Sequence, residues 1–217
     1  MSTFPGSPRI LKGGIVVLDP QSSAVLRIIP LQYNPDTLTR SFQIKGVGSE
    51  GGDRIEALRL KGPPAETIKV EAEIDATDQL EKAEDLTTKS GLHPLLSALE
   101  GLVYPSSTSL QANNAAASSG NIEIIAASAP LTVFVFGPKR IAPVRITELS
   151  ITEEAFDVEL NPIRAKISLG LRVLTIDDIA FEDRGGGLFM SYLKAKEQLA
   201  SQSKSGAFSA LGIGGLP

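Results

Sequence analysis

Residues 163–173 read Ile163-Arg164-Ala165-Lys166-Ile167-Ser168-Leu169-Gly170-Leu171-Arg172-Val173, with an apolar residue or alanine at every second position. Side chains of a β-strand point alternately to its two faces, so this pattern predicts a long strand with one face in a core and the other in water. Residues 68–75 alternate in the same way, with an inward set of Ile68, Val70, Ala72 and Ile74. Half-buried strands of this kind are typical of antiparallel sheets, and they decide the fold class.

Shorter stretches extend the β pattern on both sides of these two strands. Strands are expected at 14–18, 25–33, 37–45 and 55–60 before residue 68, and at 131–136 and 144–156 after residue 75. The stretch 131–136 is apolar on both faces, which favours a position inside the sheet. In 144–156 the apolar positions change parity near Thr147-Glu148, which predicts a β-bulge there.

Two segments have helical patterns. Pro94 suits the first turn of a helix, and an apolar stripe continues that helix to Val103. A second helix is expected over 188–200, after three glycines, Gly185–Gly187, that favour a flexible joint. The sequence therefore predicts a mainly β protein, an antiparallel β-barrel or sandwich with one packed helix and a C-terminal helical extension.

The expected domain covers residues 1–180, and 106–120 is an uncharged, small-residue stretch typical of a flexible insertion. Residues 181–217 are expected to form the glycine joint, the helix and a docking tail. Large apolar side chains beyond the joint are candidates for contact with a partner, because their exposure to water is unfavourable. They are Phe189, Tyr192, Leu193, Phe208, Leu211 and Ile213. On this interpretation, a chain ending at Arg184 keeps a folded barrel.

Composition excludes several kinds of chemistry. The 217 residues include no Cys and one His, which excludes thiolate metal sites, a cysteine nucleophile and a histidine-rich metal site. With a net charge of −4, the chain lacks the excess of basic residues that is typical of nucleic-acid-binding proteins. No apolar run is long enough for a signal peptide or a membrane span, so we expect assembly in the cytoplasm without membrane insertion. No cofactor and no metal are expected.

Two patterns that resemble active-site motifs are better explained by structure. Gly46, Gly48 and Gly51 form a G-x-G-x-x-G string, but the strand before them is half polar, which favours a hairpin tip over a dinucleotide site. Carboxylate runs such as Glu153-Glu154 and Asp177-Asp178 leave a carboxylate-dependent hydrolase open, although solvated faces and turns explain them better. We assign no catalytic residue and expect the chain not to be an enzyme.

One further string is distinctive: Leu31-Gln32-Tyr33-Asn34-Pro35-Asp36-Thr37-Leu38-Thr39-Arg40-Ser41-Phe42. It predicts a strand ending at Tyr33, a turn at Asn34-Pro35 and a second strand from Thr37. Through Tyr33, Asn34, Pro35, Thr37 and Ser41 it resembles an element of the tube-type baseplate proteins of contractile injection systems, which are phage-tail-like particles. That family often carries a LysM module, and none is evident in this chain.

Later features agree with the resemblance, which spans residues 10 to 179. They are the Leu60–Pro64 stretch before a strand, the leucine-rich helix closed by Tyr104-Pro105, and a strand running into Gly137. The resemblance implies a tube-like β-barrel that assembles as a homohexameric ring between the spike hub and the inner tube. Such a ring acts as the tube initiator.

The partners that the resemblance implies are further copies of the chain, the inner tube protein, the spike hub protein, and baseplate wedge or sheath components. The implied location is a particle assembled in the cytoplasm, with release from the cell left open. A tube terminator or cap-proximal subunit of the same system is the structural alternative. The hydrolase and a ligand-binding β-barrel are the alternatives from other classes.

Overall fold

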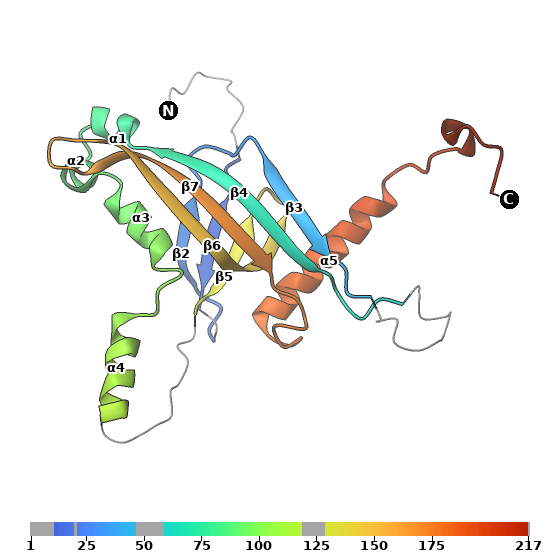
Figure 1. Ribbon diagram of the computed structural model, residues 1–217, viewed down its shortest axis with the longest axis horizontal. Coiled ribbons are helices and arrows are strands. Elements are labelled where there is room, and N and C mark those ends of the chain that lie inside the picture. Colours follow the sequence, from blue (N-terminus) through green and yellow to red (C-terminus); the bar gives the residue numbers. More distant parts are fainter. Residues whose placement is uncertain (1–10, 20, 47–58, 119–128, 217) are drawn as a thin grey trace.

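The computed structural model describes residues 11–19, 21–46, 59–118 and 129–216. Its centre is one antiparallel sheet with the strand order β2-β1-β5-β6-β7-β4-β3 (Figure 1). The strands are β1 (Gly14–Leu18), β2 (Val25–Pro30), β3 (Leu38–Gln43), β4 (Ala65–Asp75), β5 (Leu131–Val135), β6 (Ile141–Phe156) and β7 (Pro162–Val173). The helices are α1 (Thr77–Glu81), α2 (Asp85–Ser90), α3 (His93–Glu100), α4 (Ser107–Ser118) and α5 (Arg184–Ser201), with a 3-10 turn at Phe208–Leu211.

The sheet confirms the prediction of a mainly β, antiparallel fold. The inward positions expected for β4 and β7 are buried, apart from Ile163, which is partly buried, and β5 lies inside the sheet between β1 and β6. The predicted bulge is present, because the register of β6 against β7 shifts between Ile146 and Glu148. At this point the Thr147 hydroxyl donates to the Gly170 carbonyl at 3.1 Å. The alternating apolar pattern therefore fixes both the long strands and their irregularity.

The sheet is open and does not close into a barrel. Within the described residues β2 pairs with β1 and β3 pairs with β4, so these two strands form the edges. Helices bury the apolar face instead of a second layer of strands. Leu96 and Leu99 of α3 and Phe189 and Tyr192 of α5 belong to the same buried cluster as the inward strand residues. The expected barrel is therefore not formed, and helices cover the apolar face of the sheet instead. Two helices, α3 and α5, pack on it, where one was expected.

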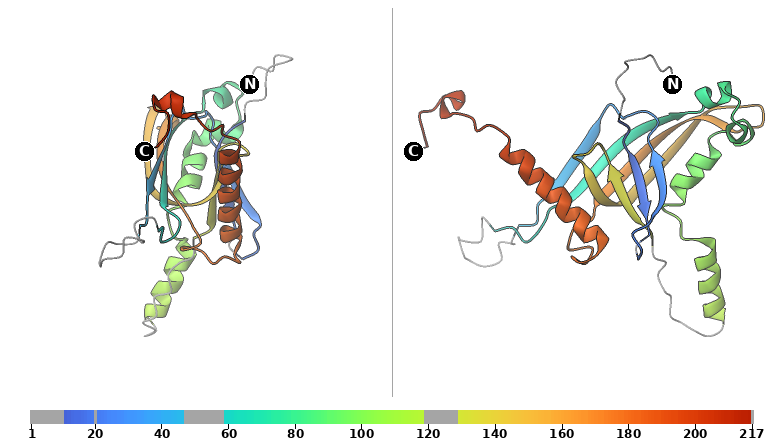
Figure 2. Two further views of the ribbon diagram at one scale, coloured as in Figure 1. Left: turned by 90° about the vertical axis from the view of Figure 1, so that its right-hand side faces the viewer. Right: turned by 180° about the vertical axis from the view of Figure 1, so that it is seen from behind.

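The segment at 106–120, expected to be a flexible loop, contains a helix. α4 extends away from the sheet and has no buried residue (Figure 2). Ser106 begins it, since its hydroxyl accepts from the Ser109 amide at 3.1 Å in the manner of an N-cap. A run of alanines after Asn114 explains the helix, because alanine has the highest helix propensity. Residues 119 and 120 lie outside the described part.

Two further expectations are affected by the extent of the described residues. The Gly46, Gly48 and Gly51 string falls mostly outside them, as does most of the strand expected at 55–60; Gly46 and Leu60 form an isolated antiparallel bridge. The short helices α1 and α2 were not predicted, because neither is long enough to show a helical period.

Candidate interaction site

Helix α5 packs on the sheet of its own chain. Phe189 is 6% exposed and Tyr192 is 4% exposed, and Leu193 is partly buried against the same core. These three residues were expected to contact a partner, and that expectation is wrong for Phe189 and Tyr192 because the chain's own sheet already covers them. The candidate docking tail is therefore shorter than expected and begins after α5.

The glycines before the predicted helix are part of α5 and do not form a flexible joint. Gly185 and Gly186 are buried in its first turn. A Cβ on Gly185 would lie 2.6 Å from Ile179 Cδ1, and a Cβ on Gly186 would overlap the Ala180 carbonyl. These glycines are needed for close approach between the helix and the preceding loop, which is the second common reason for a glycine besides flexibility.

A buried carboxylate fastens α5 to the edge of the sheet. The side chain of Glu66, on β4, is only 4% exposed. Its carboxylate accepts hydrogen bonds from Arg40 Nε at 2.7 Å, from Lys196 Nζ at 2.7 Å and from the Tyr192 hydroxyl at 2.9 Å. Phe42 lies under both cations, with the Arg40 guanidinium 4.9 Å and the Lys196 ammonium 5.4 Å from its ring centroid. We call Arg40, Phe42, Glu66, Tyr192 and Lys196 the helix latch.

The latch shifts the ionisation of its members. Burial alone would raise the pKa of Glu66, but hydrogen bonds from Lys196, Arg40 and Tyr192 outweigh it and hold that pKa below its ordinary value of 4.5. Burial and the negative charge of Glu66 raise the pKa of Tyr192 to about 12. Glu66 is therefore ionised and Tyr192 neutral at pH 7, which gives each hydrogen bond its donor and its acceptor.

The Gln32 and Asn34 side chains of the distinctive string act as backbone partners. Gln32 Nε2 donates to the Asp75 carbonyl at 2.6 Å, and Gln32 Oε1 accepts from the Asp75 amide at 2.8 Å. Asn34 Oδ1 accepts from the Gly13 amide at 3.0 Å, and its Nδ2 donates to the Leu11 carbonyl at 2.7 Å. The string therefore joins the end of β4 to the segment before β1. Each of the two side-chain amides donates to one backbone carbonyl and accepts from one backbone amide, as the backbone of a paired strand would.

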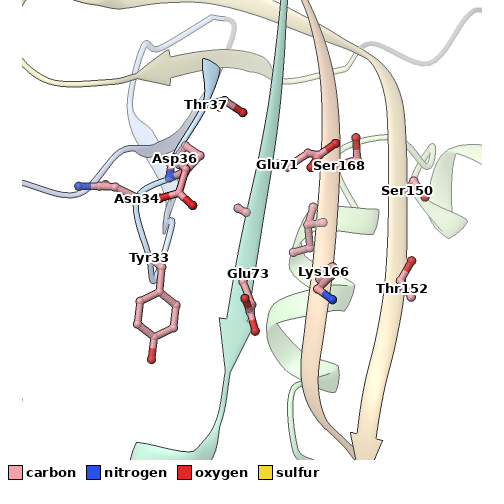
Figure 3. A pocket seen from close by; sticks show the side chains of 13 residues that line it. Tyr33, Asn34, Asp36, Thr37, Glu71, Glu73, Ser150, Thr152, Lys166 and Ser168 are labelled. Atoms are coloured by element: carbon pink, nitrogen blue, oxygen red, sulfur yellow. The ribbon is translucent and has the colours of Figure 1, made fainter. Parts of the chain in front are cut away.

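The middle of the string, Tyr33 to Thr37, borders a polar pocket of about 610 Å³ on the outer face of the sheet (Figure 3). Tyr33, Pro35 and Thr37 line it, whereas Ser41 lies further along β3 opposite Thr67. The floor consists of two rows across three strands, Glu71-Ser168-Ser150 and Glu73-Lys166-Thr152. Pro35 sets the turn that brings these residues over the sheet.

The polar pocket has the character of a solvated sheet face. Its carboxylates, Asp36, Glu71 and Glu73, are all exposed, and Lys166 is paired with Glu154 at 2.9 Å. General acid catalysis by a carboxyl group depends on burial or a like charge that raises its pKa, so solvent exposure does not favour the hydrolase alternative. Asp178, in the other carboxylate run, closes a turn by accepting from the Thr175 amide at 3.1 Å. Among the described residues no group of three His, Asp or Glu side chains is placed to hold a metal ion.

The tail after α5 keeps its large apolar groups in solvent. Phe208, Leu211 and Ile213 are exposed, and the tail extends away from the sheet beyond the end of α5 (Figure 1). These three residues remain candidates for contact with a partner. No described helix is both long and apolar enough to cross a lipid bilayer.

The two edge strands carry further exposed apolar groups. On β2, Val25, Leu26 and Ile28 are each more than half exposed. At the other edge, Phe42 is nearly half exposed, and Ile44 beyond the end of β3 is 71% exposed. Edge strands of monomeric proteins are usually protected by charges, prolines or bulges, and the exposed apolar groups at both edges depart from that pattern.

The comparisons with known proteins do not place the chain in a family. No protein-family model matches the chain, and no curated protein matches it.

The latch is the feature that the sequence interpretation missed, and a signal for it was present. Glu66 has the same parity as Ile68 and Val70, so the alternation places a carboxylate on the inward face of β4. A charge at an inward position requires paired cations and hydrogen-bond donors. That requirement predicts partners for Glu66, although the sequence does not say that two of them lie on α5.

Proposed function

We propose that the chain is a structural subunit of a contractile injection system baseplate, forming a homohexameric ring that joins the spike hub to the inner tube and initiates tube assembly. The system is proposed from the resemblance of the string around Asn34-Pro35 and the order of the features after it. The assembly role is supported by the open sheet with apolar residues at both of its edges.

The proposal of self-assembly rests on the two edge strands of the sheet. β2 and β3 are each six residues long, and each leaves one side of its backbone without a strand partner among the described residues. If β2 of one copy pairs with β3 of the next, both sets of exposed apolar side chains become buried. Such a contact joins two different surfaces, so it repeats from copy to copy and forms a ring where the rotation closes.

The exposed tail supplies a second surface for the proposed particle. Phe208, Leu211 and Ile213 lie beyond the end of α5, where they can reach a component outside the ring. In the proposed function they contact the hub, the tube or a baseplate wedge.

The experiment that tests the proposal changes one edge and measures assembly. Leu26→Lys with Ile28→Lys places two charges on β2, whereas Leu86→Lys changes a residue of α2 that is equally exposed, at 65%. Sedimentation velocity of the purified chains should show an assembled wild type, a monomeric β2 variant and an assembled Leu86→Lys control. Assembly of the β2 variant at wild-type strength, or a monomeric wild type, would contradict the proposal.

A further inference from the structure

The hairpin between β6 and β7 displays large apolar side chains at its tip. Phe156 is 50% exposed, Leu160 is 76% exposed and Val158 is fully exposed at 101%. They alternate with acidic residues in the sequence Phe156-Asp157-Val158-Glu159-Leu160. We call residues 155–161 the hairpin tip.

The hairpin tip has a fixed shape. Ala155 and Leu160 have positive φ angles of 53° and 65°, which residues with a Cβ rarely adopt. Asp157 Oδ1 accepts from the amides of Glu159 and Asn161 at 2.8 Å each, and Asp157 Oδ2 accepts from Asn161 Nδ2 at 2.8 Å. Backbone strain that surrounding bonds maintain is most often found where a segment binds something. Here the strain and the bonds hold apolar side chains in water.

A cavity of complementary character lies at the other end of the same two strands. It has a volume of about 460 Å³ and lies between the end of α3, the start of α5 and the sheet. Its apolar lining includes Leu102, Val103, Leu131, Ile146 and Ile179. We call it the end pocket. Val103 is 45% exposed, so the lining is accessible from outside.

The charges of the two surfaces are opposite. Arg145 and Arg184 line the end pocket together with Asp183, and within the described residues neither arginine forms an ion pair. The hairpin tip carries Asp157 and Glu159, and the Glu159 carboxylate has no ion pair in that part of the chain either. The hairpin tip is acidic and apolar, and the end pocket is basic and apolar. The two surfaces are therefore complementary in charge and alike in apolar character, as docking requires.

We infer that the hairpin tip of one copy docks in the end pocket of a second copy. A copy does not fill its own pocket, because the 13 residue steps from Arg145 in the pocket to Val158 at the tip span roughly 40 Å at the rise of an extended strand, and β6 runs between the two surfaces (Figure 1). The contact runs along the strands, whereas the sheet edges of the proposed ring face sideways. It therefore goes beyond the proposed function and does not depend on it.

The absence of cysteine allows a direct test by disulfide formation. Purified Val158→Cys and Val103→Cys chains are mixed and oxidised, and the expected product is a cross-linked pair containing one chain of each kind. Leu160→Cys replaces Val158→Cys as a second variant, and circular dichroism checks the fold of each chain. The matched control is Val158→Cys with Leu26→Cys on β2, which should yield at least tenfold less of the mixed pair.

The other possible occupant of the end pocket gives a different product. If the tail of a second copy fills it, Leu211→Cys cross-links to Val103→Cys while Val158→Cys and Leu160→Cys do not. That result would overturn the inference, and so would the absence of any mixed pair. Sedimentation of the same samples separates this outcome from the proposed ring, since rings can form without the tip contact.

A charge exchange provides an independent readout. Arg145→Glu should weaken association of the copies about three- to tenfold, and Glu159→Arg should weaken it similarly. The chain with both changes should recover most of the loss, because the pair is restored with its charges exchanged. Losses that simply multiply in the double variant would contradict a contact between these two side chains.

Discussion

Tyr192 donates its phenolic hydroxyl to Glu66 Oε1 at 2.9 Å, and the two residues are 126 positions apart in the chain. This bond joins the last long helix to a strand near the edge of the sheet. With Lys196 bound to the other carboxylate oxygen at 2.7 Å, it makes α5 a component of the folded domain. Within residues 181–217, the part that remains available to a partner is therefore the tail after α5.

Removal of α5 should unfold the protein, whereas removal of the tail alone should not. A chain ending at Asp183 lacks Phe189 and Tyr192, each of which contributes roughly 1.5–3 kcal/mol by burial. A chain ending at Ser203 keeps them, and the described residues that it loses, 204–216, are all exposed. Thermal unfolding followed by circular dichroism should show a cooperative transition for the longer chain only. A cooperative transition in the shorter chain would contradict the packing of α5 as part of the core.

The latch should make stability depend on pH in the acidic range. The folded-state pKa of Glu66 lies below its ordinary value of 4.5, so its carboxylate contributes stability above about pH 4.5, and this is lost as the pH falls through the folded-state pKa. Glu66→Gln should lower the free energy of unfolding by about 2 kcal/mol at pH 7, since buried donors lose a charged partner. Urea titrations should show this difference shrinking below pH 4.5.

The matched control for the latch is Glu71→Gln, which changes an exposed carboxylate on the outward face of the same strand. It should change the free energy of unfolding by less than about 0.5 kcal/mol at every pH. A Glu66→Gln effect that stays constant with pH, or one no larger than that of Glu71→Gln, would argue against a buried ionised carboxylate.

The neighbouring glycines at the start of α5 should respond in opposite directions to alanine. Gly186→Ala places a Cβ against the Ala180 carbonyl and the Phe181 backbone, and should destabilise the protein. Gly187→Ala meets no atom within 4 Å and should stabilise it by roughly 0.5–1 kcal/mol, because alanine favours the helix. Both are measured as midpoints of chemical unfolding. Stabilisation by both substitutions would indicate that the helix does not approach the loop closely.

The Gln32 amide should contribute to stability through both of its hydrogen bonds to Asp75. Gln32→Ala removes the two bonds and should cost about 1–3 kcal/mol. Gln32→Glu keeps the acceptor for the Asp75 amide but places a carboxylate oxygen against the Asp75 carbonyl, so it should restore little of the loss at pH 7. Recovery by Gln32→Glu to the wild-type midpoint would show that the donor bond is unimportant.

The sequence was sufficient for features that depend on local alternation. Strands β4 and β7 and the bulge at Thr147 were predicted because burial in a sheet follows a period of two, and a change of parity has one simple geometric cause. A helix from Pro94 to Val103 was predicted from a proline followed by an apolar stripe, and α3 covers His93–Glu100.

The candidate site was harder to predict because its contacts join distant segments. Gly185 and Gly186 look the same in sequence whether they serve flexibility or close packing, and only Ile179 and Ala180 in space distinguish the two. The hairpin tip escaped notice because Phe156 and Val158 resemble ordinary strand residues until their exposure is known. Exposure depends on where the sheet ends, which alternation alone does not define.

The most direct test of the central claim is the symmetry of the assembled chain. Single-particle electron microscopy of the purified wild-type protein should show closed rings of six copies, each of 22.9 kDa, joined through the edges at β2 and β3. Class averages with six-fold symmetry are the predicted result. A uniform population of monomers, or of dimers with two-fold symmetry, would contradict the account.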